Sequence, residues 1–451
     1  MKKRIKGLYI ITLFAVAAVT ITGCKKWLDK PAPLQVDQRV LFSNEQGFRD
    51  VLNGVYLQMG SKSLYGRDLT FGMLSVLGRS YDTTISPAVG NFYYQGARYN
   101  LQDADVVVMQ KNVWDSMYVC IANLNNLLDN IDSKQNVFTG NNYNLIKGEA
   151  LGLRAFIHFD LLRLFAPSPS QAGLSTVAIP YVTTLSPHAV PSSTTGQVLD
   201  ACVNDLLTAK SLLSDADMTT SHLTIWGVKG LLARVYMYKG DYANAQSSAQ
   251  NLISSNKFPL SVNNSDLMFV KEHLFSLWSY QNNSLALYKS VLNTAPPLGF
   301  TTTNQTALFV TGSGATSDWR KSFVDPVTGN ASGNVISPKK FTLSNANVLP
   351  MIRMSEMYYI AAECANNNLD SLKATTLLDS VRTHRNLPVY TTTALKTDSV
   401  NTEIRKEYQK EFLGEGQMFY FYKRKNLPFS SLPYTKVPVV SNASYTFIKP
   451  E

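Results

Sequence analysis

Apolar residues recur every three or four positions through much of the chain, which is the spacing of one face of a helix. The pattern is strongest over 143–166, and Pro167 then ends it because proline lacks the amide hydrogen that a helix needs. The residues on this stripe are Ile146, Ala150, Leu153, Ile157, Leu161 and Leu164. The same spacing predicts helices over 43–59, 114–131, 195–214, 224–239, 241–255, 351–368, 370–385 and 401–425.

Several of these helices follow one another after a short polar turn and should form hairpins. Gly240 and Asp241 separate 224–239 from 241–255, and glycine commonly ends a helix whereas aspartate caps one. Small residues near this turn, such as Ala233 and Ala245, resemble a tetratricopeptide unit, in which paired helices approach closely. We therefore predict an all-α fold, a tetratricopeptide-like superhelix of hairpins around 114–166, 195–255 and 351–425, with long irregular loops and a few short strands.

Two long stretches lack helical periodicity. Residues 60–112 and 260–350 are rich in polar residues interrupted by aromatic ones, such as Tyr81 and the run from Leu274 to Tyr280. Loops of this length in a compact domain usually carry function. We predict that these two regions bind the ligand and that the helices serve as their scaffold.

The amino terminus has the layout of an export signal. Lysine and arginine within the first six residues precede an apolar stretch from Leu8 to Ile21, which is short for a membrane span. Small residues then lead to Cys24, as in a bacterial lipoprotein signal, so we predict a signal peptide over 1–23 and lipid attachment at Cys24. The proline-containing segment 24–40 should be a tether, followed by one domain over 41–451. The alternatives are an ordinary secretory signal and an uncleaved membrane anchor.

Charge and cysteine content narrow the possible functions. The chain beyond residue 23 contains 38 lysine and arginine residues and 32 aspartate and glutamate residues, so its net charge is +6. This modest excess, without a long basic run, argues against nucleic-acid binding. Cys120, Cys202 and Cys364 are far apart and lie in apolar helical patterns, so we expect buried thiols and no zinc site.

Catalytic signatures are missing from the sequence. It contains no GxxxxGK, GxGxxG, HExxH or GxSxG motif, and its five histidines have no metal-ligand spacing. Charged residues within the helices, such as Glu149, Arg154, Asp160 and Arg163, are expected to pair inside the fold. We predict a protein that binds its ligand without a catalytic group, a metal ion or a cofactor.

Four segments in order along the chain carry a family resemblance. They are KKWLD at 25–29 after the lipoprotein signal, GEALGLRAFIHFDLLRLF at 148–165, IRMSEMYYIAAE at 352–363 with LDSVR at 378–382, and IRKEYQKEF at 404–412 with Glu415-Gly416. Together they cover nearly the whole chain beyond the signal, and the chain resembles the SusD/RagB family of surface lipoproteins. Gln417 departs from the pattern, since many members have arginine after Glu-Gly.

The resemblance implies an α-helical nutrient-binding lipoprotein of the outer membrane that faces the cell exterior. Its implied partner is a SusC-like TonB-dependent barrel, and its implied ligand is a glycan or, in the RagB branch, a peptide. Flat aromatic side chains cover the apolar faces of sugars, and neighbouring polar groups bind the hydroxyls. The residues in the corresponding loops, which we take as ligand-binding candidates, are Asp82, Asn91, Tyr93, Tyr94, Trp278, Tyr280, Trp319 and Arg320.

The sequence is also compatible with two other interpretations. A secreted tetratricopeptide-like scaffold, or a peptide-binding protein, would have the same helices without a glycan ligand. A lipid-anchored hydrolase would need two carboxylates across a sugar cleft, and no motif in the sequence indicates such a pair.

Overall fold

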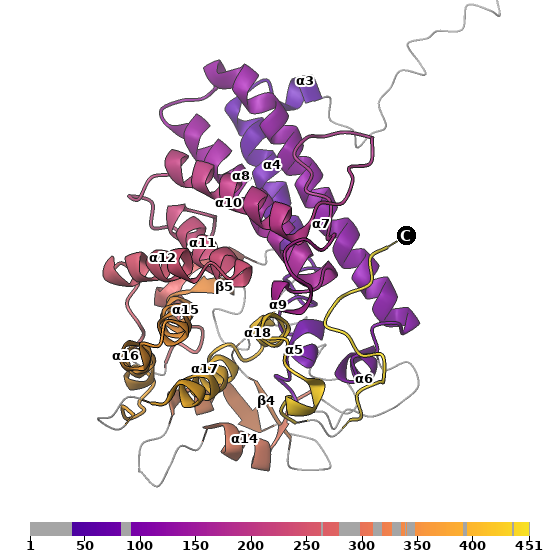
Figure 1. Cartoon of the computed structure of the whole chain (residues 1–451). Helices are drawn as coiled ribbons and strands as arrows, with labels where there is room; N and C mark the ends of the chain where they lie inside the picture. Colours follow the sequence, from indigo (N-terminus) through magenta and orange to yellow (C-terminus); the bar gives the residue numbers. More distant parts are fainter. Residues whose placement is uncertain are drawn as a thin grey trace, which may run out of the picture.

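The computed structural model describes residues 38–82, 92–262, 265–278, 298–309, 318–326, 335–338, 340, 348–390, 395–434 and 437–450. Within these ranges helices form most of the structure, and the strands form two small sheets. Figure 1 shows long helices in the upper half of the molecule and a stack of shorter helices below them. The predicted all-α, tetratricopeptide-like architecture is therefore confirmed.

The upper half is built from four helices that contact one another. They are α4 (Glu45–Met59), α7 (Ala104–Ile131), α8 (Asn142–Phe165) and α10 (Thr195–Leu212). Three of them match their predicted ranges closely, whereas α7 begins well before the predicted residue 114. Its first turns contain three consecutive valines, which have low helix propensity, but Asp103 caps the helix and Val106 and Met109 are buried, so packing outweighs propensity.

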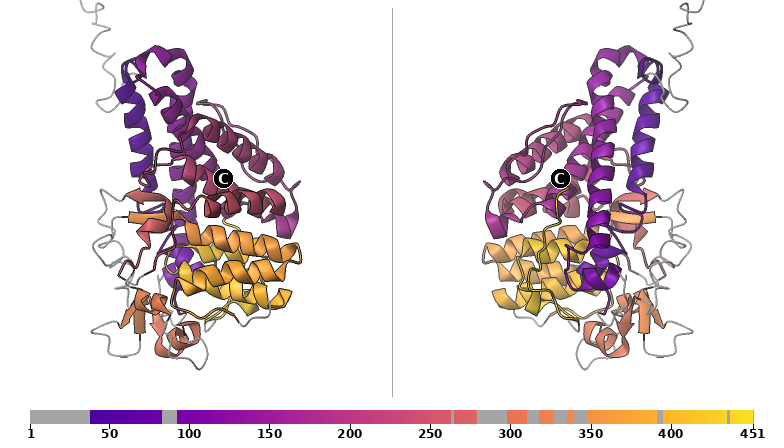
Figure 2. Two further views of the ribbon diagram at one scale, coloured as in Figure 1. Left: turned by 90° about the vertical axis from the view of Figure 1, so that its left-hand side faces the viewer. Right: turned by 90° about the vertical axis from the view of Figure 1, so that its right-hand side faces the viewer.

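The stack in the lower half contains five helices: α11 (Ile225–Lys239), α12 (Tyr242–Ser254), α15 (Met354–Asn367), α16 (Ser371–Thr383) and α17 (Thr397–Glu411). The views in Figure 2 show the later helices lying in layers below the earlier ones. Gly240 ends α11 in a left-handed conformation (φ +86°), and the Asp241 side chain accepts a hydrogen bond from Asn244 N at 3.2 Å. The predicted hairpin at this turn is confirmed.

The predicted helix over 401–425 is wrong in one respect, because the structure divides it. α17 ends at Glu411, and α18 (Gln417–Arg424) begins after a turn in which Gly414 and Gly416 have φ of +75° and +73°. A Cβ atom on Gly416 would lie 2.6 Å from Leu69 O, so both the conformation and the space require glycine here. This turn lets α18 leave the stack and pack on α5 (Met73–Leu77).

The remaining helical elements are short. They are α3 (Gln38–Leu41), α6 (Phe92–Ala97), α9 (Pro169–Ala172), α14 (Thr302–Phe309), and the 3₁₀ segments η1 (Asp132–Val137), η2 (Val270–Glu272), η3 (Trp319–Phe323) and η4 (Phe429–Ser431).

Strands occur in the region predicted to be rich in loops. β1 (His273–Trp278) pairs antiparallel with β5 (Val348–Arg353), which places Trp278 opposite Val348. β2 (Phe300–Thr301), β4 (Val335–Pro338) and β3 (Val324–Pro326) form a second antiparallel sheet in that order. The helix predicted from residue 351 therefore begins only at Met354, because residues 351–353 complete β5.

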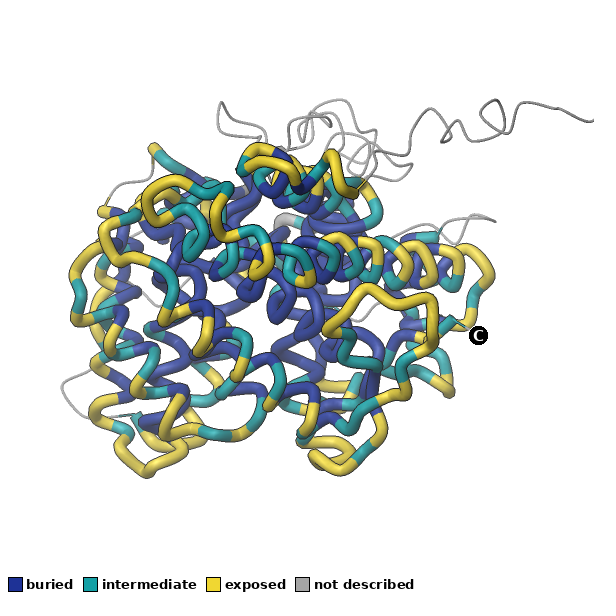
Figure 3. The backbone as a smooth tube through the Cα atoms, turned by 90° about the horizontal axis from the view of Figure 1, so that it is seen from above, coloured by how far each residue is buried: buried dark blue, intermediate teal, exposed yellow. Residues whose placement is uncertain are grey.

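The core runs along the centre of the molecule, with exposed residues at the rim (Figure 3). Every residue of α8 from Ala150 to Phe165 is buried, as expected for a helix surrounded by others. The described part of 60–112 also packs into this core. Tyr81 is buried and donates a hydrogen bond to Phe71 O at 2.5 Å, so its ring fixes this segment to the core and presents no surface.

The three described cysteines, Cys120, Cys202 and Cys364, are buried thiols, as predicted. In the described part of the chain, no helix combines the length and the apolar character that a bilayer span requires.

Candidate functional site

A hollow of about 520 Å³ opens between α4, the start of α8, the turn before α11 and the end of β1. We call it the Trp278 hollow. Its described lining residues are Arg49, Leu52, Asn53, Tyr56, Leu57, Glu149, Ser221, His222 and Trp278. The wall combines two aromatic rings with hydroxyl, amide, carboxyl, imidazole and guanidinium groups.

Helix α4 supplies one wall because of its residue spacing. Arg49, Asn53, Tyr56 and Leu57 are separated by three or four positions and so lie on one face of the helix. The opposite stripe, which includes Phe48 and Val55, is buried in the core and holds the helix in place. At its N-terminus the Asn44 side chain accepts a hydrogen bond from Gly47 N at 3.2 Å.

Trp278 is the exposed aromatic residue of the wall, and we call its side of the hollow the mouth. It is the last residue of β1, and the pairing with β5 fixes its backbone opposite Val348. Its side chain is 42% exposed, which is unusual for so large an apolar residue. A partly exposed indole beside polar groups offers a flat apolar surface to a ligand.

Glu149 and Tyr56 are half-buried lining residues joined by a hydrogen bond, and we call their side of the hollow the floor. The Tyr56 hydroxyl donates to Glu149 Oε1 and accepts a hydrogen bond from Leu223 N at 2.8 Å. Burial raises the pKa of the Glu149 carboxyl above its ordinary value. The floor therefore holds a half-buried acid group whose bonded partner is a neutral hydroxyl.

Two basic residues of the hollow are already paired with acids. Arg49 Nε donates to Glu45 Oε1 at 2.9 Å, one turn earlier on α4. His222 Nε2 lies 3.0 Å from Asp217 Oδ2. This arrangement suits reversible binding through hydrogen bonds and aromatic contact, and the described residues contain no group of three metal-ligating side chains.

The sequence-predicted candidates do not gather in one place, and of those described only Trp278 lines the hollow. Asp82 is buried, where it accepts hydrogen bonds from Asn304 Nδ2 and from Thr301 N, the latter at 3.4 Å. Tyr93 is buried on α6, and Tyr94 on the same helix is half-buried with the Arg98 guanidinium 5.6 Å from its ring centre. Asn91, Tyr280 and the predicted lipid-attachment residue Cys24 lie outside the described residues.

Trp319 and Arg320 belong to a different environment. Trp319 is half-buried, and its backbone amide donates to Arg385 O at 3.1 Å. Arg320 is fully buried and pairs with Asp318 at 2.9 Å and with Glu407 at 2.7 Å. Its guanidinium is thus enclosed by carboxylates and holds the fold together, so we remove Arg320 from the ligand-binding candidates.

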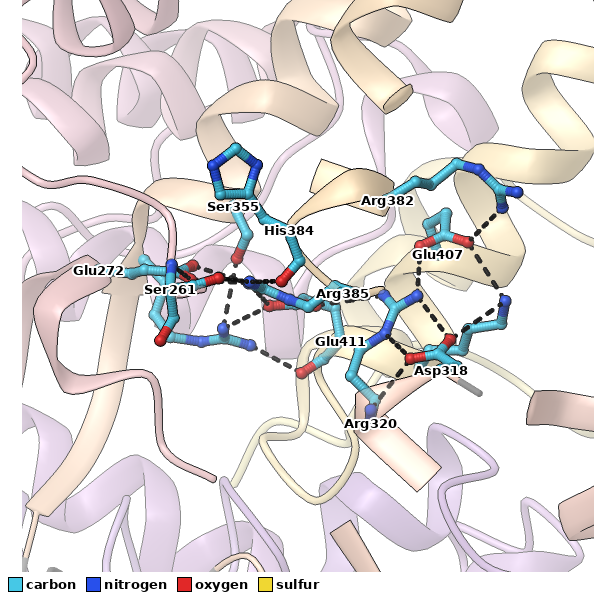
Figure 4. Close-up of polar contacts among 12 residues, drawn as sticks. Ser261, Glu272, Asp318, Arg320, Ser355, Arg382, His384, Arg385, Glu407 and Glu411 are labelled. Carbon is cyan, nitrogen blue, oxygen red and sulfur yellow. Dashed lines mark hydrogen bonds and ion pairs between the residues drawn. The ribbon is translucent and has the colours of Figure 1, made fainter. Parts of the chain in front are cut away.

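Arg320 is part of a buried cluster around Glu411, which Figure 4 shows in close-up. We call it the Glu411 network. Glu411 accepts hydrogen bonds from Arg353 NH1 at 2.7 Å and from Arg385 NH2 at 2.8 Å, and Arg320 NH1 lies 3.2 Å away. Burial alone would raise the pKa of Glu411, but the three guanidinium groups hold it well below its ordinary value.

The Glu411 network ties together elements that are far apart in the sequence. Arg353 ends β5, Arg385 follows α16, Arg320 lies in η3 and Glu411 ends α17. Arg385 also reaches Glu272 in η2 at 2.8 Å, beside the start of β1. The network thus anchors the strand that ends at Trp278.

Sequence reasoning missed most of the hollow. Glu149 was assigned to a helix contact together with Arg154, whereas Arg154 pairs with Asp205 at 2.8 Å. One signal was available: the positions three and four residues from Glu149 on α8 hold Leu145, Ile146, Gly152 and Leu153. An acid on a helix without a charged neighbour at these positions must find its partner elsewhere.

Comparison with known proteins gives two adjoining family matches. Residues 26–237 match a family described as starch-binding and associating with the outer membrane, and residues 238–433 match the SusD family. The chain belongs to the SusD/RagB family. The predicted family resemblance is confirmed.

Curated relatives cover parts of this SusD/RagB chain. SusD-like protein P2 of Formosa agariphila is 25% identical over 250 residues, which is 55% of this chain and 46% of the relative. SusD-like protein P38 of the same organism is 35% identical over 121 residues, or 26% of this chain and 22% of the relative. The matched segments therefore span about half of one relative and less than a quarter of the other.

Solved structures of the family share the fold. A SusD superfamily protein from Bacteroides thetaiotaomicron matches with a TM-score of 0.71 at 23% identity, covering 87% of this chain and 92% of that one. A SusD-like carbohydrate binding protein from Bacteroides vulgatus matches with a TM-score of 0.70 at 21% identity, covering 85% and 83%. At these identities the likeness establishes the architecture alone.

Proposed function

We propose that this SusD/RagB chain is a lipid-anchored protein of the outer-membrane surface that binds a glycan in the Trp278 hollow. The observation that carries the proposal is the exposed Trp278 indole at the mouth of a hollow lined by Asn53, Ser221 and Glu149. Sugars present apolar C–H faces surrounded by hydroxyls, so an indole with polar neighbours is complementary to them. The SusD-like carbohydrate binding protein among its structural neighbours supports this choice of ligand class.

The second part of the proposal concerns delivery. A SusC-like TonB-dependent barrel would receive the glycan, and Cys24 would carry the lipid that keeps the protein beside that barrel. The motif search and the family support a binding role without catalysis. A polysaccharide incubated with the protein should therefore be recovered at its original length.

Trp278→Ala tests the binding site. We expect the variant to bind a glycan identified on an array about tenfold or more weakly than the wild type does, because central aromatic contacts carry much of the binding energy. Isothermal titration measures the loss, and Tyr242→Ala serves as control because Tyr242 is 38% exposed on α12, outside the hollow. Binding of peptides but of no glycan would overturn the proposed function.

Cys24→Ala tests the anchor. Without the thiol no lipid can be attached, so the protein should be found in the soluble periplasmic fraction, where unmodified chains remain. Fractionation followed by immunoblotting measures this, and pull-down of the wild-type chain from solubilised membranes should recover a large β-barrel. A Cys24→Ala chain that still reaches the cell surface would contradict the anchoring.

A further inference from the structure

The charges around the Trp278 hollow do not balance within its described wall. Arg49 is committed to Glu45, with Arg49 NH2 2.8 Å from Glu45 Oε1. Glu45 also accepts hydrogen bonds from Thr139 N at 3.0 Å and from Asn142 Nδ2 at 2.9 Å. These donors, the Thr139 amide first among them, hold the pKa of Glu45 at about 2, so it stays ionised and keeps Arg49 neutralised.

The second basic group of the wall adds no net positive charge either. His222 Nε2 lies 3.0 Å from Asp217 Oδ2, and Asp217 also accepts a hydrogen bond from Thr219 N at 2.9 Å. A protonated His222 beside ionised Asp217 is a neutral pair. A neutral His222 leaves the pair with one negative charge.

Glu149 is the remaining charged group. Its Oε1 accepts the Tyr56 hydroxyl, and no described residue donates a hydrogen bond to its Oε2. Burial raises the pKa of its carboxyl, and the nearby His222 and Arg49 offset this effect only in part. Leu52, Leu57 and the Tyr56 ring are the other apolar parts of the wall. A carboxylate in such a place is costly unless a cation pairs with it.

A ligand can supply that cation. An ammonium group directed to the floor would meet Glu149, and it would form a charge-assisted hydrogen bond, about twice as strong as a neutral one. The sugar ring that carries it could then rest its C–H face on the Trp278 indole at the mouth. A neutral sugar would make the second contact and lack the first.

We propose, on the basis of the glycan-binding function above, that the hollow selects a glycan with a protonated amino group, which pairs with the Glu149 carboxylate. The inference names an amino-sugar residue as the part of the glycan that is recognised. A peptide amine has the same charge, so peptides are included in the test as the competing ligand.

Three oligosaccharide series of equal length and linkage make the test specific. Oligosaccharides of cellulose, chitosan and chitin differ at one ring carbon, which bears a hydroxyl, an amino or an N-acetylamino group. Isothermal titration of the wild-type protein at slightly acidic pH, where the amine is protonated, should show about tenfold or greater preference for the chitosan series. Titrations with lysine-containing peptides run in parallel.

Glu149→Gln isolates the charge, because glutamine keeps an oxygen to accept the Tyr56 hydroxyl. We expect the preference for the chitosan series to disappear in this variant, so that the ratio of its affinities for the three series falls to about one. Asp115→Asn is the matched control: it removes an exposed carboxylate from α7, where Asp115 pairs with Lys111, and should leave the preference unchanged.

Each outcome decides between the two proposals. Equal binding of the three series, absence of chitosan binding, or a preference that survives Glu149→Gln would overturn the amino-sugar inference. If neutral sugars bind the wild-type protein and bind Trp278→Ala more weakly, the proposed glycan-binding function is supported. Binding of peptides alone would overturn both.

Discussion

The Glu411 network and the Trp278 hollow use the same kinds of side chain to different ends. In the network, Glu411 is fully buried and contacts the guanidinium groups of Arg320, Arg353 and Arg385. In the hollow, Glu149 is half-buried and bonds to the hydroxyl of Tyr56. The first carboxylate is paired with cations of its own chain, whereas the described hydrogen-bond partner of the second is a neutral hydroxyl.

If the proposed function holds, the fold assigns support to the network and binding to the hollow. A buried charge surrounded by opposite charges and hydrogen bonds has one arrangement that satisfies all its members, so it fixes the elements that carry them. Here those elements include η2 beside β1, the strand that ends at Trp278. We call the packed helices and strands, several of which the Glu411 network joins, the frame. The hollow places the Glu149 carboxyl and the exposed Trp278 indole on this frame.

The largest effect should follow from breaking the network. Glu411→Gln removes the charge that neutralises three arginines, and leaving buried cations without their partner costs about 3–5 kcal/mol of unfolding free energy. Urea denaturation followed by circular dichroism measures the loss, and Asp115→Asn, which disrupts an exposed pair, should change it by about 0.5 kcal/mol or less. A loss below about 1 kcal/mol for Glu411→Gln would show that the network is not needed for the frame.

Acid should weaken the frame through two buried histidines. His158 Nε2 accepts a hydrogen bond from Val182 N at 3.0 Å, and His273 Nε2 lies 2.8 Å from Met268 O, with Ser276 Oγ at its other nitrogen. Burial lowers the pKa of each to about 3. An unfolded histidine has a pKa of about 6.5, so between these values the unfolded chain binds more protons.

Stability should therefore fall as the pH drops below about 6.5, by about 2 kcal/mol for each histidine at about pH 5. Urea midpoints measured from pH 7 to pH 5 check this. His158→Gln removes one of the two titrating groups and should make the decline shallower. Parallel declines in the variant and the wild type would contradict a role for His158.

Much of the frame could be predicted from the sequence, because local signals determine it. The stripe on α8 and the Gly240-Asp241 turn are readable within a window of a few residues. The division between α17 and α18 was missed although Gly414 and Gly416 are visible in the sequence. What makes it necessary is the approach of Leu69, which only the tertiary structure brings next to Gly416.

The site was less predictable, because its residues meet only in the folded chain. Tyr56 and Glu149 are separated by 93 positions, and Arg320 and Glu411 by 91. An aromatic residue in a polar stretch was the signal that singled out Trp278, which lines the hollow, and its contact with a ligand stays a prediction. The same reasoning placed Arg320 at the ligand, since its carboxylate partners on α17 belong to a distant helix.

The smallest effect on stability is expected for Glu149→Gln, which makes in the hollow the same glutamate-to-glutamine change as Glu411→Gln makes in the network. Burial raises the pKa of Glu149, so above that pKa its ionisation in the folded state opposes folding. Glu149→Gln cannot ionise and should be about 1 kcal/mol or less more stable than the wild type at pH 8. Urea denaturation should show this gain vanishing towards pH 4, where both side chains are neutral. The same glutamate-to-glutamine change would then destabilise the frame and slightly stabilise the hollow, as expected if Glu149 is kept for a ligand at the expense of stability. A loss of several kcal/mol at this position would instead make Glu149 part of the frame.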